Sequence, residues 1–292
     1  MLDLSNIPGQ KRETFILYAT GNWQAWTKPR NAKFIEIFCL GGGGGGSIQI
    51  VGTGARAGGL GGGAGGIVRG IIPAFLLPDT IYILVGKGGA GAVSSSNTSG
   101  GNGNISYIGL QPSTSEQTLI CKSSTSTPSN STVGATISTV SLSAFGNLGL
   151  FTAIAGVGAS TGGSNPSGPL PGASQAALAT SLVTGGAGGG AKQSASFASG
   201  GSITSASAIL TTQVNGGVTD AQNGDSGYGT LQPFCGTGGA GGAGRQGDSG
   251  LGGNGGNGWY GCGGGGAGAS TNFTGLRGGN GGDGLVIITV IS

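Results

Sequence analysis

The chain alternates between short apolar runs and long stretches of glycine. Four runs are rich in β-branched and aromatic residues, at positions 34–40, 67–72, 81–85 and 285–291. Their length and composition are typical of β-strands. We predict a shared core that holds Ile35, Ile37, Ile83, Val85, Ile287 and Val290. The last run should lie beside the early strands and close the domain near its start.

The glycine stretches repeat with a period of three residues. The sequence reads GGAGGAG at 238–244, GGNGGNG at 252–258 and GGNGGDG at 278–284. A three-residue period fits neither an α-helix nor a strand, but it fits polyproline II geometry. We therefore predict a bundle of polyglycine II helices, joined by the poly-Gly runs 41–46 and 185–190, with the third residue of each repeat pointing outward. The alternative is a flexible glycine linker in which nothing packs.

The segments outside the glycine repeats suggest how the chain is divided. Residues 1–20 look like an attachment lead-in, and residues 21–292 form a single glycine-rich domain. Trp23 and Trp26, ahead of Pro29, indicate an edge strand; they are either a core anchor or an attachment contact. Residues 92–180 are a Ser/Thr-rich insert, and 173–182 is the longest helix-like stretch. The predicted fold is all-β, a β-sandwich framework carrying polyglycine II helices, with essentially no α-helix.

The amino-acid composition argues against nucleic acid and membranes as partners of this chain. Glycine supplies 72 of the 292 residues, and charged residues make up only 7%, against about 25% in ordinary domains. The net charge of +3 is scattered, without the basic stripe expected of a nucleic-acid partner. No apolar run approaches the length of a membrane span, so we expect no membrane insertion. The N-terminus lacks the apolar core of a signal peptide.

The residues needed for most catalytic and metal sites are missing. There is no His, which excludes a Ser-His-Asp triad, and the four cysteines form no CxxC pair. The glycines at 41–46 follow a strand but lack the helix and the acidic residue of a dinucleotide site. We therefore expect no enzyme activity, no cofactor and no metal.

Several motifs together resemble a known family. Trp-x-x-Pro, an apolar strand ending in poly-Gly, "IPAFLLPDTIYILVGKGGAG" and the final "GGNGGDGLVIITVI" resemble the glycine-rich domain of bacteriophage structural and tail fibre proteins. The resemblance covers about 21–110 and 231–291. It implies a jelly-roll-like β-framework with packed polyglycine II helices. The phrase "DTIYILVG" also resembles a glycine-rich ectodomain segment of anaplastic lymphoma kinase and leukocyte tyrosine kinase.

The resemblance implies a function on a virus particle. In phages of the T-even kind, related adhesins cap the long tail fibre and bind the host surface. We therefore expect a virion protein, assembled in the host cytoplasm and then extracellular on the particle, at a tail fibre or its receptor-binding tip. The alternatives are a capsid or tail decoration protein, which the aromatic-poor insert keeps open, and a glycan-degrading fibre enzyme.

Partners and contact residues follow from this expectation. The partners would be other virion proteins, other copies of the chain, and a host surface glycan or outer-membrane protein. Aromatic residues on loops supply flat contact area. The candidate contacts are Trp259, Tyr260 and Phe273, with Tyr228 and Phe234 behind them. The alternative is that Trp259 and Tyr260 cap the ends of the glycine helices.

Overall fold

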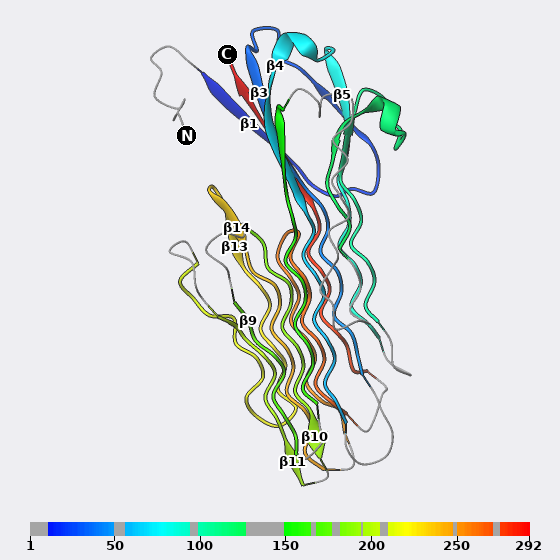
Figure 1. Cartoon of the computed structure of the whole chain (residues 1–292), viewed down its shortest axis with the longest axis vertical. Helices are drawn as coiled ribbons and strands as arrows, with labels where there is room; N and C mark the ends of the chain where they lie inside the picture. Colours follow the sequence, from blue (N-terminus) through cyan, green and yellow to red (C-terminus); the bar gives the residue numbers. More distant parts are fainter. Residues whose placement is uncertain are drawn as a thin grey trace.

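The computed structural model describes residues 11–49, 56–93, 99–126, 149–164, 168–176, 182–193, 195–204, 210–247, 250–270 and 275–292. This part of the chain is all-β, which confirms the predicted fold class. Its only helical elements are two single 3₁₀ turns, η2 (Ala74–Leu76) and η3 (Glu116–Thr118). The molecule is long, with its longest strands at one end and glycine-rich segments running to the other, where the short strands β10 and β11 lie (Figure 1).

Two antiparallel sheets face each other at the upper end of Figure 1. The first has the order β1-β15-β3-β4-β8, and the second has the order β2-β5-β6-β7. The strands of the first sheet are β1 (Arg12–Leu17), β15 (Leu285–Ile291), β3 (Phe34–Leu40), β4 (Ile67–Pro73) and β8 (Phe151–Ile154). Those of the second are β2 (Gln24–Thr27), β5 (Thr80–Leu84), β6 (Tyr107–Gly109) and β7 (Leu119–Lys122). The jelly-roll connection itself stays a prediction.

The C-terminal strand closes the first sheet, as predicted. β15 pairs antiparallel with β1 on one side and with β3 on the other. The register sets Val290 opposite Ile35 and Val286 opposite Cys39. The two ends of the described chain also meet here, because Ser292 donates its backbone N–H to the carbonyl of Lys11 at 3.1 Å.

The sandwich core lies between the two sheets. Ile35, Ile37, Ile83, Val85 and Val290 are buried in one cluster, as predicted. The prediction was wrong for Ile287. Successive residues of a strand point to opposite faces, so Val286, Ile288 and Val290 face the core. Ile287 is half-buried on the other face, in a second cluster with Phe38.

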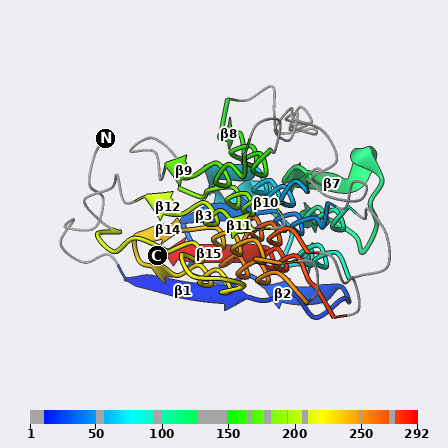
Figure 2. The same ribbon diagram turned by 90° about the horizontal axis from the view of Figure 1, so that it is seen from below.

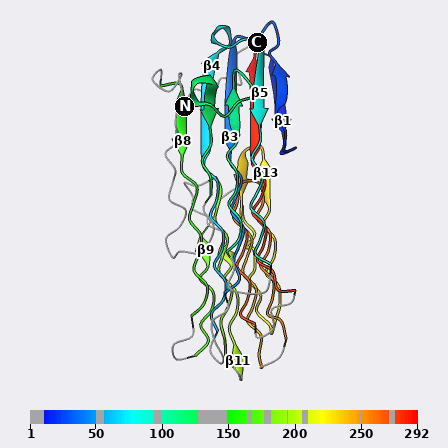
Figure 3. The same ribbon diagram turned by 90° about the vertical axis from the view of Figure 1, so that its right-hand side faces the viewer.

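Strands of both sheets continue directly into the glycine-rich segments (Figure 3). The hydrogen bonds of residues 264–266 show how these segments are held. The amide of Gly264 donates to the carbonyl of Gly44 at 2.9 Å, that of Gly265 to Gly256 at 2.8 Å, and that of Gly266 to Ala187 at 2.9 Å. Three successive amides thus reach three different segments, as a helix with three residues per turn and no internal hydrogen bonds requires.

The carbonyl groups of the same segment accept hydrogen bonds from further segments. The carbonyls of Gly265, Gly266 and Ala267 accept from the amides of Gly279, Gly242 and Gly59, at 2.8, 3.0 and 2.7 Å. Residues 264–267 therefore donate to three neighbouring segments and accept from three others. Figure 2 shows the segments stacked in layers when seen along their length. This is polyglycine II packing.

We call this region the glycine bundle. Its segments are 41–48, 56–66, 86–93, 99–104, 155–164, 170–174, 184–192, 198–202, 214–218, 222–228, 236–245, 252–258, 261–270 and 276–284. Three short strand pairs extend it: β9 (Gln175–Ala176) with β12 (Ile203–Thr204), β10 (Lys192–Gln193) with β11 (Ser196–Phe197), and β13 (Gly229–Leu231) with β14 (Phe234–Gly236). The flexible-linker alternative does not fit this hydrogen bonding.

The Ser/Thr-rich insert contributes to both parts of the fold. Within 92–180, β6 and β7 extend the second sheet and β8 extends the first. Residues 99–104 and 155–164 join the glycine bundle. Of the helix-like stretch 173–182, residues 175–176 form β9, and residues 177–181 lie outside the described residues.

The third residue of the repeats does not always point outward. Asn257 is exposed and Asn254 is half-buried, in line with the prediction. Ala240 and Ala243, however, have no exposed surface, and Ala240 packs with Ala187 in a small cluster inside the bundle. A methyl group at these positions fits between helices, so the GGAGGAG repeat at 238–244 is interior, whereas the GGNGGNG repeat at 252–258 lies at an edge.

Candidate functional site

The predicted aromatic contacts lie where the sandwich meets the glycine bundle. Trp259 and Tyr260 occupy the turn between segments 252–258 and 261–270, and Phe234 is buried on β14. Their rings form a chain, with centroid distances of 5.3 Å from Phe234 to Trp259 and 5.0 Å from Trp259 to Tyr260. Phe38 and Tyr18 extend it at either end, at 4.9 and 5.8 Å. The rings thus bridge the outer face of the first sheet and the ends of the glycine helices.

Two glycines make room for the indole of Trp259. A Cβ atom on Gly236 would lie 2.4 Å from Cε3 of Trp259, and one on Gly229 would lie 2.5 Å from the same atom. The ring therefore fills a space that the β13–β14 hairpin leaves open. This packing supports the capping interpretation of Trp259.

Trp259→Ala is expected to destabilise the protein. Truncating a fully buried aromatic costs about 3–5 kcal/mol; because Trp259 is half-buried, we expect about 2 kcal/mol. A thermal melt measures the loss, and attachment to cells measures any contact role. Lost attachment with an unchanged melting temperature would contradict the capping interpretation.

The other predicted residues lie apart from this chain of rings. The Tyr228 hydroxyl donates to the carbonyl of Thr212 at 2.5 Å and accepts the amide of the same residue at 2.9 Å. Phe273 lies outside the described residues. Trp26 is buried in the sandwich core, which removes it as an attachment contact. Trp23 is half-buried, with its ring 6.3 Å from that of Tyr107.

A ladder of side chains covers one face of the glycine bundle. The segments 86–93, 276–284, 252–258 and 222–228 form this face, which we call the outer row. Along it, four Asn or Asp residues accept a backbone amide of the next segment on Oδ1: Asn254 from Arg277 (2.8 Å), Asn257 from Asn280 (2.9 Å), Asn280 from Gly91 (2.8 Å) and Asp283 from Gly88 (2.7 Å). Side-chain oxygens thus take the place of a further glycine helix.

The ladder has a regular spacing. Asn254 and Asn257 are one turn apart on one helix, and Asn280 and Asp283 are one turn apart on the next. One turn of three residues rises about 9.3 Å, at about 3.1 Å per residue. The outer row therefore presents its polar side chains in columns with a spacing of one helix turn. The backbone that carries them is held in place by hydrogen bonds to the segments behind it.

A shallow hollow of about 440 Å³ lies within the ladder. It is lined by Gly88, Gly89, Ala90, Asn257, Asn280, Gly281 and Asp283. Asn257, Asn280 and Asp283 are exposed, while the glycines bring the backbone close to the floor of the hollow. The hollow therefore combines amide groups, one carboxylate and a nearly bare backbone.

Tyr260 stands close to this carboxylate. Partial burial, and then the proximity of Tyr18 and Asp283, raise the pKa of the Tyr260 phenol. The phenol therefore remains protonated well above neutral pH. It gives this end of the face an aromatic ring and a neutral hydroxyl group.

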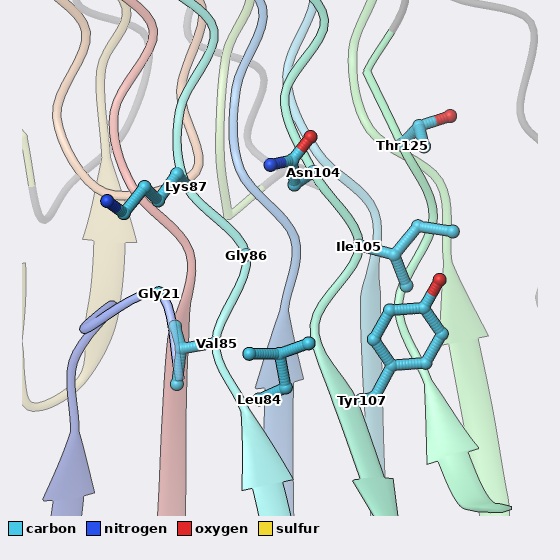
Figure 4. Close-up of a pocket in the computed structure, with 9 residues that line it drawn as sticks. All are labelled: Gly21, Leu84, Val85, Gly86, Lys87, Asn104, Ile105, Tyr107 and Thr125. Atoms are coloured by element: carbon cyan, nitrogen blue, oxygen red, sulfur yellow. The ribbon is translucent and has the colours of Figure 1, made fainter. Parts of the chain in front are cut away.

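A second hollow, of about 500 Å³, lies at the junction of the second sheet and the bundle. Figure 4 shows Leu84, Ile105 and Tyr107 on one side of it, and the Lys87 amine directed toward the Gly21 loop. Among the described residues, no hydrogen bond or ion pair orients the Lys87 amine or the Asn104 side-chain amide, unlike the polar groups of the ladder. This hollow offers apolar surface and one cation.

The four cysteines of the chain lie away from solvent. The cysteines Cys39, Cys121, Cys235 and Cys262 are unpaired and buried. Burial raises the pKa of Cys262 to about 12, and a protonated, buried thiol is a poor nucleophile. In the part of the chain that the structure describes, no cluster of three or more His, Cys, Asp or Glu could hold a metal ion, and no helix could cross a membrane.

Sequence reasoning missed the ladder residues as a site. Asn257, Asn280 and Asp283 were noted only as the third residue of each repeat. The signal was present, since Asn or Asp stands every third residue in just the repeats at 252–258 and 278–284, whereas 238–244 has Ala. The neighbours of each repeat could not be inferred from this spacing.

Comparison with known proteins finds one family. The model of the glycine-rich domain family matches residues 18–290, nearly the whole chain. No curated protein matches the chain.

Proposed function

We propose a function from the premise that the chain belongs to the glycine-rich domain family: it is a non-enzymatic structural protein of a bacteriophage particle, at a tail fibre or its tip, where it contacts the host surface. The observation that carries the proposal is the glycine bundle, whose segments are joined to one another by backbone hydrogen bonds along their length. Such a bundle is rigid without a large apolar core. It suits a protein that must hold a surface away from its attachment point.

The two ends of the molecule differ in a way that supports this role. Four apolar side chains are exposed at the sandwich end, away from the bundle: Phe34 (42%), Ile71 (39%), Leu76 (38%) and Phe75 (84%). Phe34 and Ile71 lie on the adjacent strands β3 and β4, and η2 follows β4 directly. An exposed apolar patch is typical of a protein–protein interface. We assign this end to a neighbouring virion protein and the bundle to the host side.

Labelled particles test the proposal. Antibodies against the chain should mark the fibre or its distal end in electron micrographs of the phage that encodes it. Purified chain should also compete with that phage for adsorption to its host. Labelling over the capsid shell would favour the decoration protein instead, and absence from the particle would reject both.

The enzyme alternative has its own measurement. We expect no release of sugars when the chain is incubated with host envelope polysaccharide, because the chain has no His and only nine acidic residues, which are scattered along the sequence. Depolymerisation by purified chain would overturn the non-enzymatic assignment.

A further inference from the structure

The ladder fixes the orientation of its amide groups. An Asn side chain has an acceptor oxygen at one end of its planar group and an NH₂ donor at the other. Because Oδ1 of Asn257 and Oδ1 of Asn280 each accept a backbone amide, the Nδ2 atoms are set on the opposite side. Their donors are therefore directed before any ligand arrives, which reduces the entropy lost on binding.

The hollow complements these donors with other groups. Asp283 uses one carboxylate oxygen for the amide of Gly88, and its second oxygen can accept from a ligand. The exposed methyl group of Ala90 lies in the same hollow. Donors, an acceptor and a small apolar surface thus share one site of about 440 Å³.

We propose that the ladder hollow binds a glycan that carries acetamido groups. The acetamido carbonyl would accept from Nδ2 of Asn257 or Asn280, its methyl group would lie on Ala90 and the glycine floor, and sugar hydroxyls would donate to Asp283. A polymer suits the site better than a single sugar, because the columns repeat every turn along the helix. This inference deepens the proposed host contact and moves it from the aromatic residues to the outer row.

Asn→Asp variants separate binding from folding. Aspartate keeps the oxygen that accepts the backbone amide, so the ladder stays intact, but it replaces the outward NH₂ donor with an oxygen. The test variants are Asn257→Asp and Asn280→Asp. The matched control is Asn31→Asp, which makes the same charge change at an exposed turn of the sandwich, next to Phe34 and far from the outer row.

Two oligosaccharides with the same β-1,4 linkage serve as probes. Isothermal titration should show binding of an N-acetylglucosamine hexamer, and at least tenfold weaker binding of a glucose hexamer. Each test variant should lose at least tenfold in affinity for the N-acetylated probe, while Asn31→Asp should match the parent chain. NMR titration should shift the side-chain amide signals of Asn257 and Asn280 first.

Several outcomes would overturn the inference. The inference fails if the N-acetylated hexamer does not bind, or if the two hexamers bind equally well. It also fails if both variants keep full affinity for the N-acetylated hexamer at an unchanged melting temperature. If a variant melts at a lower temperature, the NMR shifts of the parent chain decide the site. Particle labelling tests the proposed function separately, so fibre labelling without hexamer binding rejects only the glycan site.

Discussion

Gly265→Ala is expected to lower the free energy of unfolding by about 3 kcal/mol, the upper range for overpacking a tight interior. Gly265 lies in segment 261–270, which has neighbours on every side. An added Cβ atom would lie 2.0 Å from the carbonyl oxygen of Ala240 and 2.6 Å from its carbon. These are backbone atoms that cannot rotate away, so two helices must separate. Their separation also strains the hydrogen bonds of Gly265 to Gly256 and Gly279.

Chemical denaturation of the variant measures this loss, and Gly101→Ala is its control. Gly101 belongs to the same bundle, but a Cβ atom there would meet its nearest atom, the amide nitrogen of Ala90, only at 3.2 Å. Position 101 is also exposed, so we expect a loss below about 1 kcal/mol, the lower limit for overpacking. If both variants were as stable as the parent chain, the glycines would be acting as a linker and the bundle would not exist in solution.

The same reasoning extends to the repeat GGNGGNG. Gly255 and Gly256 both face neighbouring segments. A Cβ atom on Gly255 would lie 2.0 Å from the carbonyl oxygen of Gly265, and one on Gly256 would lie 1.9 Å from that of Asp225. The Asn254 side chain instead lies at an edge, where water can replace its hydrogen bond to Arg277. A glycine substitution in this repeat should therefore cost more than Asn254→Ala.

The local pattern of the sequence was enough to predict the long core strands and the glycine helices, but not β1, which lies in the predicted lead-in. Runs of β-branched residues gave β3, β5 and β15, because a buried strand needs side chains that pack on a pleated surface. The three-residue period predicted the polyglycine II helices, because polyproline II has three residues per turn and the 3₁₀ helix, which shares that repeat, is rarely longer than about four residues. Both signals lie within a single segment and need no knowledge of its neighbours.

The arrangement of those elements could not be predicted in the same way. Ala240 and Asn257 hold the same position in their repeats, yet one is buried and the other exposed, because one segment is surrounded and the other is at an edge. The sequence left Trp259 as either a contact or a cap, and the packing of its ring against Gly229 and Gly236, which favours the cap, depends on segments far away in the chain. The candidate site depends on such long-range neighbours, and glycine repeats carry little information about which segment lies next to which.

Ile288→Ala is the second substitution with a large expected effect. Ile288 has no exposed surface and lies in the sandwich core, on a strand paired on both sides, opposite Ile37 of β3 and Phe15 of β1. Removing its side chain leaves a cavity between the two sheets. We expect a loss of about 4 kcal/mol, within the range of about 2–5 kcal/mol for Ile→Ala in a core. Urea or guanidinium unfolding measures it.

Ile287→Ala is the matched comparison, one residue away on the same strand. Ile287 is half-buried on the opposite face, where it packs near Phe38, so its truncation should cost about half as much, about 2 kcal/mol. Which of the two variants loses more unfolding free energy reports the register of β15, because a slip by one residue moves every side chain of the strand to the opposite face. A larger loss for Ile287→Ala would mean that β15 pairs with β1 and β3 in a register shifted by one. That shift would also move the segment 276–284, and with it Asn280 and Asp283, relative to the rest of the outer row.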